Sequence, residues 1–264
     1  MKNIKLLGAC CNYGQTRYGP RAAPYYVETR LNKKFTKIKE NGSTNVFDYD
    51  LLYSVHNYEL NNNKNIITIG GDHSISYSTV SSALNMYDDS LHVIWIDAHT
   101  DINTQSTSAT QNLHGMPVGH LMGFEKHPIS TFHNKLLDPS QITYIGIRDV
   151  DPPECERIKK NHISIYNAFY YSQSLGVLDH LKEQLKGKNV YISLDLDSLD
   201  PCVFPCTGTA VPNGLYLPEI LNIIDTFKDQ SIGMDIVEFD PLINNKYNKD
   251  CLDSIYKIID TYSN

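Results

Sequence analysis

The chain has 264 residues, of which 41% are hydrophobic and 20% are charged, and its formal net charge is -7. This length and composition fit one α/β enzyme domain, so we expect residues 1–264 to form a single domain with a sizeable core. The excess of acidic residues argues against a nucleic acid as partner and is compatible with a small cationic substrate. No apolar run approaches the roughly 20 residues that a membrane span needs, so we expect no membrane association.

The cysteines show neither the C-x-x-C spacing nor the spacing of a zinc finger. This pattern is typical of reduced thiols in a cytosolic chain rather than of a disulfide framework. We therefore expect a cytoplasmic protein. The six cysteines are Cys10, Cys11, Cys155, Cys202, Cys206 and Cys251.

Short apolar runs rich in isoleucine and valine alternate along the chain with amphipathic segments. The runs are not interrupted by polar residues at every second position, which is typical of a parallel sheet covered on both faces. This alternation predicts an α/β fold with a mainly parallel central sheet. In chain order we expect a strand at Ile4–Ala9, a helix at Pro20–Leu31, a strand at Ile66–Ile69, a helix at Ser74–Met86, a strand at His92–Ile96, a helix at His114–Leu121, a strand at Ile142–Ile147, a helix at Leu175–Leu185, a strand at Val190–Leu194, a helix at Leu217–Phe227, a strand at Ile232–Val237 and a helix at Asp250–Tyr262.

Prolines and one polar run refine these bounds. Pro20 and Pro218 suit the first turn of a helix, where the missing N–H has no intrahelical partner to lose. The run Asn61–Asn65 is polar and rich in asparagine, so we expect a surface loop there.

Acidic motifs begin where four of the apolar runs stop. The motifs are Gly70–Ser74, Asp97–Asp101, Ser193–Asp197 and Gly233–Glu238. Ligands of open parallel sheets bind outside the carboxyl ends of the strands, so these four motifs should converge at one edge. Buried carboxylates are costly unless cations neutralise them, which two divalent metals and a cationic substrate would do.

The spacing within the motifs indicates metal ligands. Alternate side chains of an extended backbone share a side, so Asp97, His99 and Asp101 can all point into one cavity. Asp195 and Asp197 repeat this spacing, and His73 follows two glycines that permit a tight turn. Each piece alone is also typical of a loop or a helix cap, but together they supply two imidazoles and four carboxylates. That set suits two hard divalent ions such as Mn²⁺, whose charge balances the four carboxylates.

With these motifs in place, the chain resembles the ureohydrolases, and within them most closely the arginases. The resemblance runs from Gly14–Pro20 to Glu238–Pro241 and covers nearly the whole chain. It implies a three-layer α/β/α fold and two Mn²⁺ ions per subunit. It assigns one ion to His73, Asp97, Asp101 and Asp195, and the other to Asp97, His99, Asp195 and Asp197, so that Asp97 and Asp195 bridge.

The resemblance also implies a substrate and a reaction, which is hydrolysis of L-arginine to L-ornithine and urea by a hydroxide that bridges the metals. Asp101 would orient the hydroxide, Glu238 would hold the guanidinium as a bidentate partner, and His114 would pass a proton to the leaving amine. The remaining positions would contact substrate: Asn103, Ser108, Thr110 and Asn112 from the loop that holds the α-carboxylate, Asp151 at the α-amino group, Glu154 through water, and Thr209 near the guanidinium.

The chain departs from the arginase pattern in the same loop. Ser108 and Thr110 exchange the usual order of threonine and serine, and Gln111 stands where a glycine is typical. Both hydroxyls survive, but the methyl group of Thr110 narrows the site. We expect a homo-oligomer, with a trimer favoured by the resemblance alone.

Other interpretations stay open. A sister ureohydrolase would act on agmatine, guanidinobutyrate or another guanidino compound, and the hydroxyls and amides between Asn103 and His114 favour arginine over these. A deacetylase of related fold is disfavoured by the number of metal ligands. A non-catalytic binding protein of the same fold would need no tight metal site. His114 could simply start a helix, and Glu238 could pair with an arginine.

Overall fold

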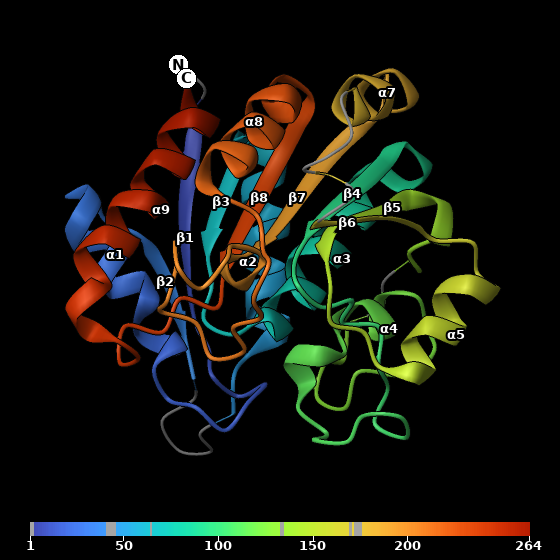
Figure 1. The fold of residues 1–264 in the computed structure, drawn as a ribbon, viewed down its shortest axis with the longest axis horizontal. Helices are drawn as coiled ribbons and strands as arrows, with labels where there is room; N and C mark the ends of the chain where they lie inside the picture. The colour runs from blue at the N-terminus through green and yellow to red at the C-terminus, as the bar shows by residue number, and fades with distance from the viewer. Residues whose placement is uncertain (1–2, 41–45, 64, 133–134, 169–170, 172–175) are drawn as a thin grey trace.

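A computed structural model describes residues 3–40, 46–63, 65–132, 135–168, 171 and 176–264 (Figure 1). The described strands form one eight-stranded sheet in the order β2-β1-β3-β8-β7-β4-β5-β6, and every neighbouring pair is parallel. The sheet includes both β1 and β8, and a single domain over residues 1–264 stays a prediction. The strands are β1 Ile4–Cys10, β2 Thr36–Lys39, β3 Asn65–Ile69, β4 Leu91–Ile96, β5 Ile142–Ile147, β6 Ser164–Asn167, β7 Asn189–Asp195 and β8 Ser231–Val237.

Helices cover both faces of this sheet, as Figure 1 shows. On one face, α1, α7, α8 and α9 pack against strand residues such as Ile94 and Ile96. On the other face, α2, α3, α4 and α5 pack against the residues between them, such as Val93 and Trp95. The predicted three-layer α/β/α fold is therefore confirmed. The helices are α1 Ala23–Leu31, α2 Tyr49–Asn63, α3 Ser76–Tyr87, α4 Pro117–Leu121, α5 Pro152–Lys160, α7 Val177–Gln184, α8 Leu217–Phe227 and α9 Asn248–Ser263.

All six predicted strands are present, and two further strands lie at the edges of the sheet. The edge strands β2 and β6 are four residues long and partly exposed, so neither carries the apolar run that marks a buried strand. The predicted helix at Pro20–Leu31 is a 3-10 turn, Pro20–Ala22, followed by α1. Pro218 lies in the first turn of α8, as expected.

The polar run at Asn61–Asn65 is not a loop. Asn61 and Asn62 lie in the last turn of α2, where each side chain donates to the carbonyl oxygen four residues earlier. Asn65 already belongs to β3, and residue 64 lies outside the described part of the chain. Burial of Leu52 and Leu60 favours α2 although its end has a low helix propensity. Neither α2 nor α5 was among the helices predicted from the sequence.

The bounds of other predicted helices also differ from those observed. The expected helix at His114–Leu121 divides into a 3-10 turn, Leu113–Gly115, and the short α4. The expected helix at Leu175–Leu185 corresponds to α7, and its first residue lies outside the described residues.

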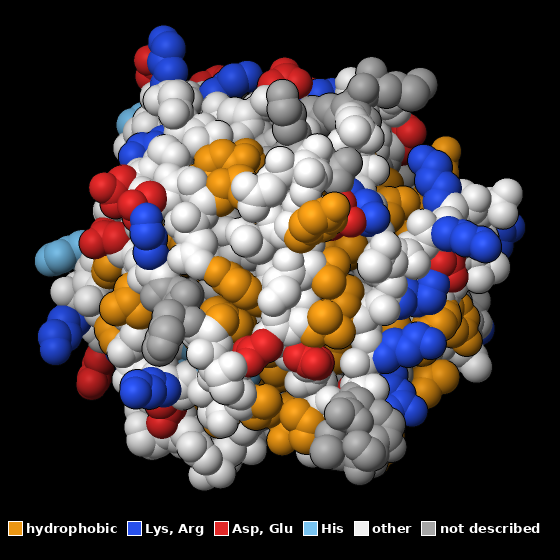
Figure 2. All heavy atoms as spheres, turned by 180° about the vertical axis from the view of Figure 1, so that it is seen from behind, with side chains coloured by type: hydrophobic (Ala, Val, Ile, Leu, Met, Phe, Trp, Pro, Cys, Tyr) orange, Lys and Arg blue, Asp and Glu red, His pale blue; other side chains and the backbone are white. Residues whose placement is uncertain are grey.

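Hydrophobic, polar and charged side chains all occur on the outer surface of the molecule. Seen from behind, hydrophobic side chains appear in separate groups between polar and charged ones (Figure 2). Within the described ranges, no helix combines the length and the apolar character needed to cross a membrane.

Candidate metal centre and substrate pocket

The register of the central strands places the acidic motifs at one edge of the sheet. Ile69 pairs with Ile236, which pairs with Leu194, which in turn pairs with Ile96. These residues form one row across β3, β8, β7 and β4, and the motifs occupy the next positions along each strand. The predicted convergence of distant motifs is therefore produced directly by parallel pairing.

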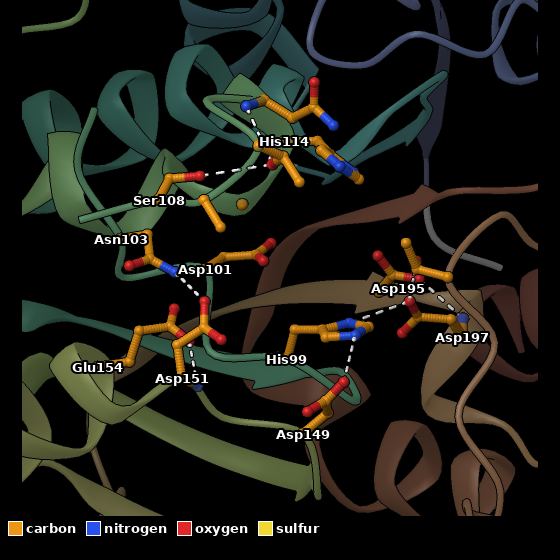
Figure 3. Close-up of a pocket in the computed structure, with 15 residues that line it drawn as sticks. His99, Asp101, Asn103, Ser108, His114, Asp149, Asp151, Glu154, Asp195 and Asp197 are labelled. Carbon is orange, nitrogen blue, oxygen red and sulfur yellow. Dashed lines mark hydrogen bonds and ion pairs between the residues drawn. The ribbon is translucent and has the colours of Figure 1, made fainter. Parts of the chain in front are cut away.

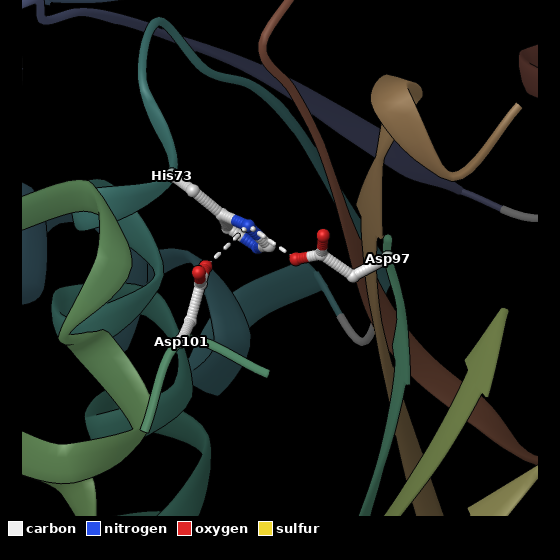
Figure 4. Close-up of side chains that lie close together, drawn as sticks. All are labelled: His73, Asp97 and Asp101. Atoms are coloured by element: carbon white, nitrogen blue, oxygen red, sulfur yellow. Dashed lines mark ion pairs between the residues drawn. The ribbon is translucent and has the colours of Figure 1, made fainter. Parts of the chain in front are cut away.

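His73 stands at the centre of a carboxylate cluster (Figure 4). Its Nδ1 atom lies 3.1 Å from Asp97, 3.0 Å from Asp101 and 3.1 Å from Asp195, measured to one oxygen of each carboxylate. This nitrogen is buried, and none of the three contacts has regular hydrogen-bond geometry. On the other side of the ring, Nε2 lies 2.9 Å from the hydroxyl of Ser193, so Nδ1 faces the carboxylates as a metal ligand would.

His99 faces a second part of the same cluster. Its Nδ1 atom lies 3.2 Å from Asp197 and 3.5 Å from Asp97, and its Nε2 atom lies 3.8 Å from Asp149. Asp97 therefore lies between the two histidines. Thr209, which does not belong to the cluster, donates a 2.7 Å hydrogen bond to Asp197 and so helps to orient that carboxylate.

The electrostatics of this cluster call for cations. Burial and the neighbouring Asp97 raise the pKa of Asp101 to about 7. Burial, Asp197 and Asp97 together raise the pKa of Asp195 well above its usual range. Carboxylates packed this closely oppose one another's ionisation, and divalent cations would relieve that repulsion.

The donor set fits two such cations. Two groups of donor atoms are close enough to share an ion, one from His73, Asp97 and Asp101 and the other from Asp97, His99 and Asp197. Asp195 lies beside His73 and completes the six predicted positions. One imidazole with several carboxylate oxygens is a set that hard divalent ions accept. The exact ligand assignments, including the two bridging roles, stay predictions.

Glu238 and His114 form an ion pair next to this cluster. His114 Nδ1 lies 3.1 Å from Glu238 Oε1, and Glu238 is only 1% exposed. Burial lowers the pKa of His114, but the contact with Glu238 outweighs it and raises the pKa to about 9. Burial raises the pKa of Glu238, but the contact with His114 lowers it overall. The pair is therefore charged at neutral pH.

The backbone is strained at two of these positions. Asp101 and Glu238 have φ angles of 50° and 65°, in the left-handed region that non-glycine residues rarely adopt. Strain of this kind persists where surrounding contacts impose it, and such positions cluster at functional sites. Both residues carry predicted catalytic roles.

A cavity of about 300 Å³ opens above the cluster (Figure 3). The structure brings every predicted substrate-binding residue to its wall. Glu238 is not one of the lining residues, but its partner His114 is. The predicted residues that line the cavity are His99, Asp101, Asn103, Ser108, Thr110, Asn112, His114, Asp151, Glu154, Asp195, Asp197 and Thr209.

One end of the cavity is built from the start of α5 and the loop after β4. Asn103 donates a 3.0 Å hydrogen bond to Asp151. Asp151 and Glu154 form a capping box at the start of α5, with the Asp151 N–H donating to Glu154 at 3.0 Å. Glu154 also accepts the N–H of Ile102, so backbone donors occupy both of its oxygens. This carboxylate braces the loop as well as lining the cavity.

The hydroxyls of Ser108 and Thr110 help to shape their own loop. The N–H of Gln111 donates to Ser108 at 3.0 Å, and the N–H of Asn112 donates to Thr110 at 3.3 Å. Gln111 has a φ angle of 59°, a conformation that glycine adopts without strain. The glycine that arginases typically have at this position therefore has a local physical reason.

Several contacts of the site were absent from the sequence analysis. Ser193 precedes Asp195 by two residues on β7, so the period of a strand could have placed it on the same side. Asp149 precedes Asp151 by the same spacing. Asp72 lies within the Gly70–Ser74 motif and accepts the N–H of Gly14, but no spacing predicts this contact. Gln15, in the loop after β1, contacts Glu238, and no spacing in the sequence points to it.

The chain is similar to known arginases in sequence and in fold. The sequence model of a family described as the Arginase family matches residues 2–252. Arginase from Plasmodium berghei is 38% identical over 205 residues, which cover 73% of this chain and 57% of that protein. Arginase from Staphylococcus aureus strain MRSA252 is 30% identical, and the match covers 92% of each chain. The crystal structure of Entamoeba histolytica arginase in complex with L-ornithine has a TM-score of 0.82 at 25% identity, covering 100% of this chain and 99% of that one.

The extent of these matches differs between relatives. The chain spans between 46% and 61% of the length of the first curated relatives that it matches. Against the S. aureus arginase and the solved E. histolytica structure, the coverage is nearly complete on both sides.

Proposed function

Because the chain belongs to the arginase family, we propose that it is a binuclear metal hydrolase that converts L-arginine to L-ornithine and urea with two Mn²⁺ ions. The observation that carries the proposal is the shared cavity, which has a carboxylate cluster at one end and Asn103, Asp151 and two hydroxyls at the other. A guanidinium and an amino-acid head group are the two polar ends of arginine. The L-ornithine complex of the E. histolytica arginase supports the same substrate class.

The metals would be held by His73, His99 and the four aspartates of the cluster. Bound there, they would lower the pKa of water so that hydroxide is available near neutral pH. The remaining work falls to residues of the chain. Asp101, whose carboxylate lines the cavity, would accept a hydrogen bond from the attacking hydroxide and so orient it.

Glu238 would hold the guanidinium through parallel N–H···O hydrogen bonds. In the structure its Oε1 atom is paired with His114, so the substrate would take over part of that contact. His114 carries a proton at neutral pH because its pKa is raised to about 9. It would deliver that proton to the leaving nitrogen, which departs as the side-chain amine of ornithine.

The decisive experiment is urea release by the manganese-loaded protein with arginine and agmatine in parallel. Release from arginine alone would support the proposal, including the predicted contacts of Asn103 and Asp151 with the amino-acid head group. Release chiefly from agmatine would keep the hydrolytic chemistry and refute the substrate. Absence of release from both, with two metals bound, would favour another guanidino compound or a binding role.

The assembly and the cellular location are proposals on resemblance and composition. We propose a homo-oligomer, with a trimer favoured, in the cytoplasm, acting on a small cationic guanidino substrate and binding neither nucleic acid nor membrane. Sedimentation of the manganese-loaded protein tests the assembly, because a single species of monomer mass would contradict it.

A further inference from the structure

The loop after β1 reaches Glu238 through one side chain. Gln15 donates a 2.8 Å hydrogen bond from Nε2 to Glu238 Oε2. The other oxygen of the same carboxylate, Oε1, accepts the backbone N–H of His73 at 2.9 Å and lies 3.1 Å from His114 Nδ1. The two oxygens of Glu238 are therefore held by different donors, and Gln15 serves the one that His114 and His73 leave open.

The loop that carries Gln15 is itself tightly fixed. The N–H of Gly14 donates to Asp72 at 2.8 Å, and the N–H of Asp72 donates back to the carbonyl of Cys11 at 3.1 Å. A Cβ atom on Gly14 would lie 2.4 Å from an Asp72 oxygen, so the approach is closer than any other residue would allow. The loop also accepts the N–H of His114 at the Gly14 carbonyl, at 3.1 Å. One short loop thus contacts both members of the His114–Glu238 pair.

The chemistry of a carboxamide suits this position. A lysine or arginine at the same place would neutralise Glu238 and compete with a cationic substrate. The Gln15 amide is neutral, so it can fix the plane of the carboxylate and leave its charge available. Residues that orient a functional group in this way commonly matter almost as much as the group itself.

We propose that Gln15 is a positioning residue for the guanidinium, since it holds the Glu238 carboxylate in the orientation that a bidentate contact needs. This inference rests on the proposed function, because it takes Glu238 as the partner of the substrate's guanidinium. It adds a positioning residue from a segment that carries none of the metal motifs.

The test compares two fragments of the substrate on the manganese-loaded protein. Guanidinium ion represents the side-chain end, and norvaline keeps the amino-acid head group without a cation at its other end. Gln15→Met keeps the length of the side chain and removes its donor, and Gln15→Asn keeps the amide but is too short to reach Oε2. Gln184→Met, at the exposed end of α7, is the matched control.

Both Gln15 variants should lower kcat/KM for arginine about 10- to 100-fold. Inhibition by guanidinium should weaken about as much, while inhibition by norvaline and the manganese content stay within about twofold of the wild type. A loss shared equally by both fragments would overturn the proposal, since it would indicate a general disturbance of the site. Gln15 variants indistinguishable from Gln184→Met would overturn it as well.

Failure of the proposed function is recognised separately. If the wild type releases no urea from arginine, the substrate assignment is wrong, and the role of Gln15 is then judged by calorimetric binding of guanidinium. Weaker binding in both Gln15 variants would uphold the positioning role, and unchanged binding would refute it.

Discussion

The two ends of the cavity are built in different ways. At the end with the predicted metal ligands, here called the metal end, Asp97 directly follows β4 and Asp195 is the last residue of β7, and these two strands pair side by side. At the head-group end, Asn103, Ser108 and Thr110 lie on a long loop that is braced by the start of α5. Figure 3 shows Asn103, Asp151 and Glu154 on one side of the cavity and Asp195 and Asp197 on the other.

From this difference we expect the strand ends to carry the chemistry and the loop to carry the selectivity for substrate. Strand ends in a covered parallel sheet are held by backbone pairing on both sides, so they can keep several like charges in place. A loop held by its own side chains can change its contacts without disturbing the sheet. Changes at the metal end should therefore abolish activity on any guanidino substrate, whereas changes at the loop end should alter the choice among substrates.

The largest effect should come from Asp97→Ala. Asp97 lies between both histidines, so its loss should disturb both metal positions and lower kcat/KM on the order of 10,000-fold for every guanidino substrate. Metal analysis should find fewer than two manganese ions per chain. Asp229→Ala, at an exposed position after α8, is the control. Retention of two tightly bound ions by Asp97→Ala would contradict the shared-ligand role.

Glu238→Gln should have the next largest effect. The substitution keeps the shape of the side chain and removes the charge that a guanidinium would meet, so kcat/KM for arginine should fall roughly 100- to 1,000-fold. Manganese content should stay at the wild-type value, which distinguishes this variant from Asp97→Ala. Near-normal turnover would show that Glu238 does not hold the guanidinium.

Asp151→Ala should separate the two ends of the cavity. It removes the partner of Asn103 and the predicted contact to the α-amino group. Turnover of arginine should fall about 10- to 100-fold, and turnover of butylguanidine, which lacks the head group, should change much less. Equal losses on the two substrates would mean that the loop end supports the whole site rather than selecting the substrate.

The smallest effect should come from Thr110→Ser. Both residues offer a hydroxyl, and Thr110 is exposed, so KM for arginine should change by no more than about twofold. Steady-state kinetics with arginine check this. A large change would show that the methyl group of Thr110 shapes the head-group end. The loop would then tolerate substitutions less well than its exposed position suggests.

Much of the metal end could be predicted from the sequence. Asp97, His99 and Asp101 follow an uninterrupted apolar run, and side chains two residues apart in an extended segment share one side. The run identifies a buried strand, and a buried strand whose end carries ionisable groups needs partners for them. The structure places these residues, with His73, Asp195 and Asp197, in one cluster.

Other parts could not be predicted in this way. The edge strands β2 and β6 have no apolar run, and α2 ends in asparagines whose low propensity is overcome by packing of Leu52 and Leu60. Gln15 lies 223 residues from Glu238 along the chain, so nothing local signals their hydrogen bond. Such contacts depend on where an entire strand pairs in the sheet.

The sequence by itself determined the fold class, the positions of the central strands and the side chains that are predicted to bind metal, because burial and strand period depend on the local order of residues. The tertiary structure decided which strands are neighbours and therefore which distant side chains meet. It set His114 against Glu238 Oε1, Ser193 behind His73 and Gln15 against Glu238 Oε2. The physical reason is that pairing of parallel strands is non-local, and a single choice of register fixes all of these contacts together.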